Sequence, residues 1–164
     1  MTADTDFAFL DPGTPRDGDL ELACRERRLA ASGRGFVPAY IFSMRHVPDG
    51  AHMGDINLRI GDSEHIVMYA GHIGYGVDPA FRGRHYAARS CRLLLPLALR
   101  HNLDPLWITC NHDNLLSRRT CEIAGGVLVE IVPVPVNNPL YDQGDRFKCR
   151  YRFDTARLIA EGSA

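Results

Sequence analysis

The feature that most constrains the fold is a short basic turn between a strand-like stretch and a helix-like stretch. The turn reads DPAFRGRHYAARS over residues 78–90. Such a turn leaves unpaired N–H groups at the start of the following helix, where the helix dipole adds positive potential. Arg82 and Arg84 add formal charge, and Gly83 permits a backbone twist that other residues resist. The turn predicts a site for a phosphate or pyrophosphate; the alternative is a solvated surface turn.

The segments before this turn predict one helix followed by three strands. Asp19 is a candidate cap for a helix over residues 20–32, whose apolar residues form a weak face. Turn-forming residues then separate the stretches 38–47, 52–61 and 64–78. This punctuation is typical of an antiparallel meander.

The segments after the turn predict two helices. Residues 86–102 place apolar side chains on one face, with a kink expected at Pro96 because proline donates no backbone hydrogen bond. Residues 113–126 predict a second helix, capped by Asp113 or Asn114 and ended by a pair of glycines.

Three further strands complete the expected order, and they cover residues 105–111, 127–135 and 146–154. The loop 136–145 joins the last two, and the end of the chain from residue 158 is expected to fray. This order predicts an α/β fold, a central mixed β-sheet flanked by helices, in one domain over residues 1–164.

Composition excludes several classes of protein. The net charge of −1 argues against a general nucleic-acid binder, and no run approaches the ~20 apolar residues of a membrane span. No basic and apolar leader is expected. The odd number of cysteines and the absence of a CxxC pair argue against a disulfide framework or a metal site, and reduced thiols favour a cytoplasmic location. The cysteines are Cys24, Cys91, Cys110, Cys121 and Cys149.

Two landmarks in order resemble the coenzyme-A-binding core of the GNAT family of N-acetyltransferases. The family turn has the pattern Arg/Gln-x-x-Gly-x-Gly/Ala, and here the turn reads Arg82-Gly83-Arg84-His85-Tyr86-Ala87. The second landmark is a strand followed by Asn-x-x-Ser/Ala and a helix that ends in glycine. Here it is Asn114, Ser117 and Gly125-Gly126, so the resemblance covers about residues 66–132.

The resemblance implies a GNAT-like fold and transfer of an acetyl group from acetyl-coenzyme A to an amine. It implies that the turn binds the coenzyme A pyrophosphate and that N–H groups around Val77 polarise the thioester carbonyl and pair with the pantetheine arm. Asn114 would bond near the thiol end; the alternative is a plain helix cap. The implied cofactor-binding residues are Val77, Arg82, Gly83, Arg84, His85, Tyr86, Ala87, Asn114 and Ser117.

Three positions depart from the family pattern. His85 replaces a glycine; it is interpreted as a tolerated exposed residue, although its imidazole could bond a phosphate. Cys121 stands where many members have a tyrosine acid; a buried hydrophobe is the ordinary interpretation of a cysteine, and its thiol is the alternative acid. His72 stands where many have a glutamate base, and it is either the base or a strand histidine bonded to backbone.

The sequence thus predicts an acetyltransferase, with a small-molecule amine favoured over a protein as acceptor. The rival is a catalytically weak coenzyme-A-binding sensor or partner module, and a third reading is a binder of nucleotide phosphates. Neither nucleic acid nor membrane is expected as a partner, and a homodimer is compatible with the pattern. The loop 136–145 and the helix predicted over 20–32 are expected to frame the acceptor pocket.

Overall fold

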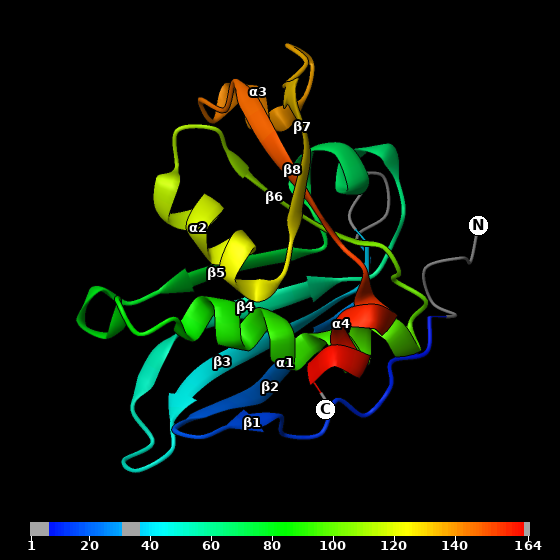
Figure 1. Cartoon of the computed structure of the whole chain (residues 1–164). Coiled ribbons are helices and arrows are strands. Elements are labelled where there is room, and N and C mark those ends of the chain that lie inside the picture. The colour runs from blue at the N-terminus through cyan, green and yellow to red at the C-terminus, as the bar shows by residue number, and fades with distance from the viewer. Residues whose placement is uncertain (1–6, 31–36, 163–164) are drawn as a thin grey trace.

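A computed structural model describes residues 7–30 and 37–162 of the chain. Two antiparallel sheets lie side by side, with helices against them (Figure 1). The larger sheet follows the order β1 (Arg16–Asp17), β2 (Leu20–Arg28), β3 (Ala39–His46), β4 (His52–Arg59) and β5 (Ile73–Val77). The smaller sheet follows the order β6 (Leu106–Asn111), β8 (Phe147–Phe153) and β7 (Val127–Pro133).

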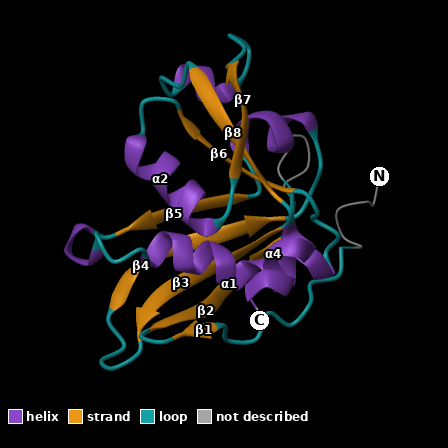
Figure 2. Cartoon of the chain, viewed as in Figure 1, coloured by secondary structure: helices purple, strands orange, loops and turns teal. Residues whose placement is uncertain are grey.

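The helical segments fall between strands in the chain, except α4, which follows β8, and they lie against the sheets in space (Figure 2). They are α1 (Tyr86–Arg100), α2 (Leu115–Ala124), α3 (Pro139–Asp142) and α4 (Thr155–Gly162), with two short helical segments, η2 (His65–Ala70) and η3 (Pro79–Phe81). The α/β class is confirmed. The strands pair as two antiparallel sheets, where the sequence suggested one mixed sheet.

The helix predicted over residues 20–32 is wrong for its described part, because Leu20–Arg28 is strand β2. Leu20 and Leu22 are both fully buried, so the apolar residues alternate along the strand and face the core. Pairing with β3 on one side overrides the weak helical pattern. The expectation that a helix in this segment frames the acceptor pocket is therefore wrong for Leu20–Arg28.

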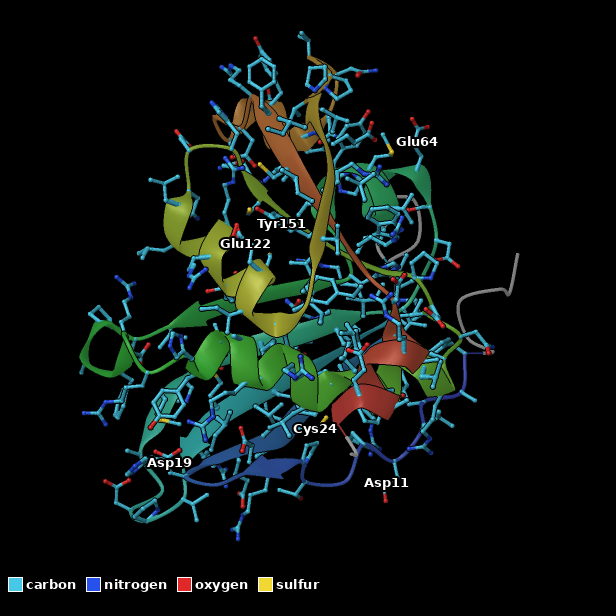
Figure 3. All side chains as sticks on the ribbon, viewed as in Figure 1. Asp11, Asp19, Cys24, Glu64, Glu122 and Tyr151 are labelled. Carbon is cyan, nitrogen blue, oxygen red and sulfur yellow. The ribbon has the colours of Figure 1, made fainter. Side chains whose placement is uncertain are left out.

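Asp19 also does not cap a helix. Its carboxylate accepts hydrogen bonds from Tyr86 Oη at 2.6 Å and from Arg89 Nη2 at 2.8 Å (Figure 3). Both donors belong to α1, so Asp19 fixes the first turns of α1 against the edge of the larger sheet.

Two further expectations are corrected. In the segment 64–78 only Ile73–Val77 is a strand, because His65–Ala70 forms a π-helical turn that ends at Gly71 with φ 76°. The expected frayed end includes most of α4, where Leu158 is buried against the core and Thr155 Oγ1 donates to Leu103 O at 2.7 Å.

Helix α1 forms the centre of the core. Its buried face packs on β4 and β5 on one side and on α2 and α4 on the others, as the predicted apolar face requires. The helix continues through Pro96. The prediction of a kink there remains a prediction. The first turn of α1 is thereby held beside the end of β5, which positions the basic turn.

Candidate active site

A cavity of about 690 Å³ lies between the facing edges of the two sheets. Strand β5 ends the larger sheet and β6 ends the smaller one. They are joined where His72 N–H donates to Trp107 O at 2.7 Å, and beyond that point residues of both strands line the cavity. Among residues 7–30 and 37–162, no strand pairs with the edge of β5 that faces the cavity, so its backbone groups can pair with an extended ligand.

Residues of the basic turn line this cavity. Gly83 has φ 88°, and His85, the residue before α1, also adopts the left-handed region with φ 62° and ψ 25°. The left-handed region favours glycine, which explains why the family pattern has glycine where this chain has His85. The N-terminus of α1 and the turn therefore lie together at the cavity wall, an arrangement that binds anions at helix N-termini in other proteins.

The structure brings most of the predicted binding residues to the cavity wall and leaves one out. The lining set comprises Val77, Arg82, Gly83, His85, Tyr86, Ala87, Asn114 and Ser117. Arg84 does not line the cavity, whereas Arg82 does and donates from Nε to Val77 O at 3.0 Å. The two arginines of the turn are therefore not equivalent.

This difference gives a first prediction. Arg82→Ala should raise the Kd of coenzyme A about 10-fold, the effect of losing one hydrogen bond to a charged group, and should leave kcat nearly unchanged because a phosphate does not change charge during transfer. Arg84→Ala is the matched control and should change the Kd less than 3-fold. Isothermal titration of both variants measures this. Equal effects, or a loss of kcat with unchanged affinity, would contradict the assignment.

His72 is placed between backbone groups and outside the cavity wall. Its side chain is fully buried, Nδ1 accepts from Trp107 N–H at 2.9 Å, and Nε2 lies 3.0 Å from Gly61 O. Since Nδ1 accepts, Nε2 carries the proton and donates it to Gly61. Burial lowers the pKa of His72. Both ring nitrogens are engaged, so this geometry favours the structural alternative over a general base.

A second prediction follows for His72→Gln. The Gln amide also has an acceptor and a donor, but its flexible chain does not fix them where the buried imidazole ring holds Nδ1 and Nε2, so the free energy of unfolding should fall by about 1–3 kcal/mol. The pKa of His72 is held below its ordinary value of 6.5, so the contribution of this residue is complete above that pH and is lost as pH falls toward the folded pKa.

Chemical denaturation at several pH values measures both effects. His52→Gln, at a half-exposed histidine, is the control and should unfold like the parent. The acidic limb of the pH–rate profile should survive in folded His72→Gln. If the acidic limb disappears while the free energy of unfolding is unchanged, His72 is the general base after all.

A hydroxyl pair lies inside the cavity on the side of α2. Tyr75 Oη and Ser117 Oγ are 2.6 Å apart, and both residues line the cavity. Burial raises the pKa of Tyr75, so its phenol stays protonated at neutral pH. Asn114 caps α2 by accepting from Ser117 N–H at 3.1 Å, which confirms the cap and fixes the Ser117 backbone.

The two nearby thiols differ in access. Cys121 is fully buried and does not line the cavity, and its hydrogen bond with Cys110 together with burial raises its pKa. Cys110 does line the cavity, and hydrogen bonds from Cys121 and Ser117 with the charges of Arg118 and Lys148 lower its pKa despite burial. The geometry therefore gives Cys121 the ordinary role of a buried small hydrophobe.

The other end of the cavity carries a buried ion pair. Lys148 Nζ lies 3.0 Å from Asp145 Oδ2, and Asn111 Nδ2 donates to Asp145 Oδ1 at 2.9 Å. Burial opposes ionisation, but these two hydrogen bonds lower the pKa of Asp145. Asn111 Oδ1 is buried without a partner, so this wall can accept one more hydrogen bond. Asp145 thus belongs to the pocket, as the loop 136–145 was expected to.

Sequence reasoning missed most of this far end. Arg59 from β4, Asn111 from β6 and Lys148 from β8 line one cavity because strands from distant parts of the chain surround it. No spacing in the sequence signals that they share a cavity. Within residues 7–30 and 37–162, no three His, Cys, Asp or Glu side chains form a group that could hold a metal ion. No helix in those ranges is long and apolar enough to cross a membrane.

Solved structures with the same fold were found in structural comparison. A Microcin C7 self-immunity acetyltransferase, MccE, in complex with acetyl-CoA and AMP shares 17% identity over 71% of this chain and 61% of its own, with a TM-score of 0.54. RimL, a ribosomal L7/L12 alpha-N-protein acetyltransferase, in complex with coenzyme A shares 19% identity over 74% and 63%, with a TM-score of 0.55. A GNAT acetyltransferase from Bacillus anthracis shares 18% over 71% and 66%, with a TM-score of 0.56.

The chain spans about three fifths of the length of the first of these structures, so the likeness speaks for the fold alone. None of the curated proteins compared with the chain matches it. The model of the acetyltransferase (GNAT) domain matches residues 2–127, a span that includes β5, the basic turn, α1, β6 and α2. This family uses acetyl-CoA, and the cavity described above is lined by the basic turn, the start of α1 and strand β5. The chain belongs to the GNAT acetyltransferases.

Proposed function

We propose that this protein transfers the acetyl group of acetyl-CoA to the amine of an acceptor. The observation that carries the proposal is the cavity between β5 and β6, which has an anion-binding helix start at one end and a hydroxyl pair inside. The turn would hold the pyrophosphate, and the free edge of β5 would pair with the amides of the pantetheine arm. The thioester would then lie beside β5, deep in the cavity.

The reaction needs no covalent enzyme intermediate. The lone pair of the neutral amine attacks the thioester carbonyl carbon, the C–N bond forms and the C–S bond breaks. The products are an N-acetyl amine and the thiol of coenzyme A, because the amine loses one proton and the thiolate gains one. Backbone N–H groups around Val77 would stabilise the oxyanion that develops on the carbonyl.

Ser117 is our proposed proton donor for the leaving thiolate. Its hydroxyl lines the cavity and is 2.6 Å from Tyr75 Oη, a phenol that can replace the proton that Ser117 gives up. Cys121 is buried behind the cavity wall and is not needed in this role. This pair supplies an acid although the chain lacks the usual tyrosine of the family helix.

Deprotonation of the acceptor amine is assigned to water in the cavity. An alkylammonium group has a pKa near ~10, so transfer should accelerate with pH as the free amine becomes abundant. His72 has no free ring nitrogen to accept this proton, and Asp145 is ion-paired with Lys148. We place the reaction in the cytoplasm, with an amine acceptor as partner.

The rival reading is a coenzyme-A-binding sensor without transfer activity, and one experiment separates the two. Purified protein is mixed with acetyl-CoA and a panel of amines, and release of free thiol is followed together with the mass of each amine. Transfer predicts thiol release that matches acceptor acetylation one to one. Saturable binding of coenzyme A with no thiol release above the hydrolysis background would favour the sensor, and competition by ATP alone would favour a nucleotide binder.

A further inference from the structure

We infer that Arg59 binds an anionic group of the acceptor, so that the substrate is a small amine bearing a carboxylate or a phosphate. This inference rests on the proposed transfer reaction and names its substrate class. Arg59 ends strand β4 and lines the cavity at the end where β5 begins. The sequence gives no sign of this role.

Arg59 has a guanidinium without a carboxylate partner. Its Nη1 donates to Ala70 O at 3.1 Å and to Gly71 O at 2.9 Å, and none of the ion pairs in the described part of the chain includes it. Burial lowers the pKa of Arg59, which reflects the cost of holding this charge away from water. An anionic group of a ligand would compensate this partly buried positive charge.

The remaining N–H groups of Arg59 are available to a ligand. Nη2 and Nε make no hydrogen bond within residues 7–30 and 37–162, and neither atom is among the buried side-chain atoms that lack a partner. Nη2 lies over the backbone of Gly74, where an added Cβ would come within 2.9 Å of it. The bare backbone of Gly74 thus leaves the face of the guanidinium open to the cavity.

Among the described residues no carboxylate forms an ion pair with Arg59, and the exposed carboxylate of Asp62 lies 3.4 Å from His72 Nε2 instead. His65 and His72 lie near enough for its charge to lower their pKa values further, after burial, and both are therefore neutral at pH 7. Lys148 lines the same cavity, but Asp145 already neutralises it. Arg59 is therefore a cavity-lining cation whose charge is left for a ligand.

The anion at Arg59 belongs to the acceptor and not to the cofactor. The backbone N–H of Arg59 donates a hydrogen bond to the carbonyl oxygen of His72, the residue before β5, at 2.7 Å. The basic turn follows the other end of β5. The guanidinium lies over Gly74, and three residue steps of ~3.3 Å separate Gly74 from Val77, so about 10 Å of strand lies between the two sites. The phosphates of coenzyme A occupy the turn, and the thioester lies between the two sites.

Matched acceptors test this inference. Thiol release is measured with amino acids and their carboxamides, and with aminoalkyl phosphates and the corresponding amino alcohols. We expect kcat/KM to be about 10-fold to 100-fold higher for the anionic member of each active pair, the effect of one hydrogen-bonded charge. The carboxylate and phosphate pairs show which anion is preferred. Equal kcat/KM within both pairs would overturn the inference and leave the transferase proposal standing.

Variants give a second readout. Arg59→Gln should remove this preference by raising KM for the anionic acceptor, while KM for acetyl-CoA and the rate with the neutral acceptor hold. Arg59→Lys should keep part of the preference, and Arg45→Gln, at an exposed residue of β3, should keep all of it. Loss of rate with both kinds of acceptor alike would mean that Arg59 only holds Ala70 and Gly71, and would overturn the inference.

Direct binding keeps the test independent of turnover. If no amine releases thiol, NMR titration of the coenzyme-A-saturated protein with an amino acid and with its carboxamide still compares the two ligands. Tighter binding of the amino acid that disappears in Arg59→Gln supports the anion site. Equal binding, or none for either kind of ligand, contradicts it whatever the outcome for the transferase proposal.

Discussion

Ser117→Ala is expected to lower kcat by about 100-fold, the lower end of the range for loss of general acid–base catalysis. The hydroxyl is 2.6 Å from Tyr75 Oη inside the cavity, and without it the thiolate loses its proposed proton donor and Tyr75 loses the group through which it would pass a proton. Affinity for coenzyme A should change little, because the hydroxyl acts on charge that develops only in the transition state. Single-turnover kinetics and cofactor titration separate these two effects.

Tyr75→Phe should reproduce a smaller part of the loss, since Ser117 keeps its own proton but loses the group that replaces it. The control is Ser90→Ala. The Ser90 hydroxyl is buried on α1 without a hydrogen-bond partner and does not line the cavity, so its removal should leave kcat unchanged. If folded Ser117→Ala keeps kcat within threefold of the parent, the proton comes from elsewhere.

Gly54→Ala is expected to lower the free energy of unfolding by about 3 kcal/mol, the upper end of what overpacking costs. Gly54 pairs with Val77 across β4 and β5. An added Cβ would overlap the carbonyl oxygen of Gly76 and come within 2.9 Å of Val77 Cα. These atoms are backbone and cannot turn aside, so the two strands must separate beside the cofactor cavity.

Gly76→Ala is the matched control for stability. It lies on the neighbouring strand, and a Cβ there meets no atom within 4 Å. Urea denaturation of the two variants should show a large shift of the midpoint for Gly54→Ala and a small one for Gly76→Ala. Equal midpoints would show that β4 and β5 tolerate a side chain at this crossing and that their close approach does not shape the cavity.

Local sequence signals predicted the basic turn and the helix cap of the candidate site. The turn from Arg82 to Ala87 and the cap at Asn114 both depend on neighbouring residues, which the sequence displays directly. Helices α1 and α2 also begin and end within two residues of the predicted bounds. These elements carry their own caps, glycines and periodicity, so tertiary contacts did not have to be known.

The sequence pattern was misleading or uninformative for residues whose structure depends on a partner strand far away in the chain. The segment Leu20–Arg28 has a weak helical face and becomes a strand because β3 pairs with it. The His72 ring was a candidate base until the fold placed Trp107 and Gly61 against its two nitrogens. Arg59 and Lys148 gain their place in the cavity from strands far apart in the chain. Such residues are defined by topology, which no local pattern records.

Thermal unfolding with and without coenzyme A tests the central claim, that the cavity between β5 and β6 binds this cofactor. A ligand at 100 times its Kd stabilises the fold by ~2.7 kcal/mol, so the Tm should rise by several degrees and then follow the logarithm of the coenzyme A concentration. The rise should be smaller for Arg82→Ala at the same concentration. An unchanged Tm of the parent protein up to millimolar coenzyme A would contradict the account.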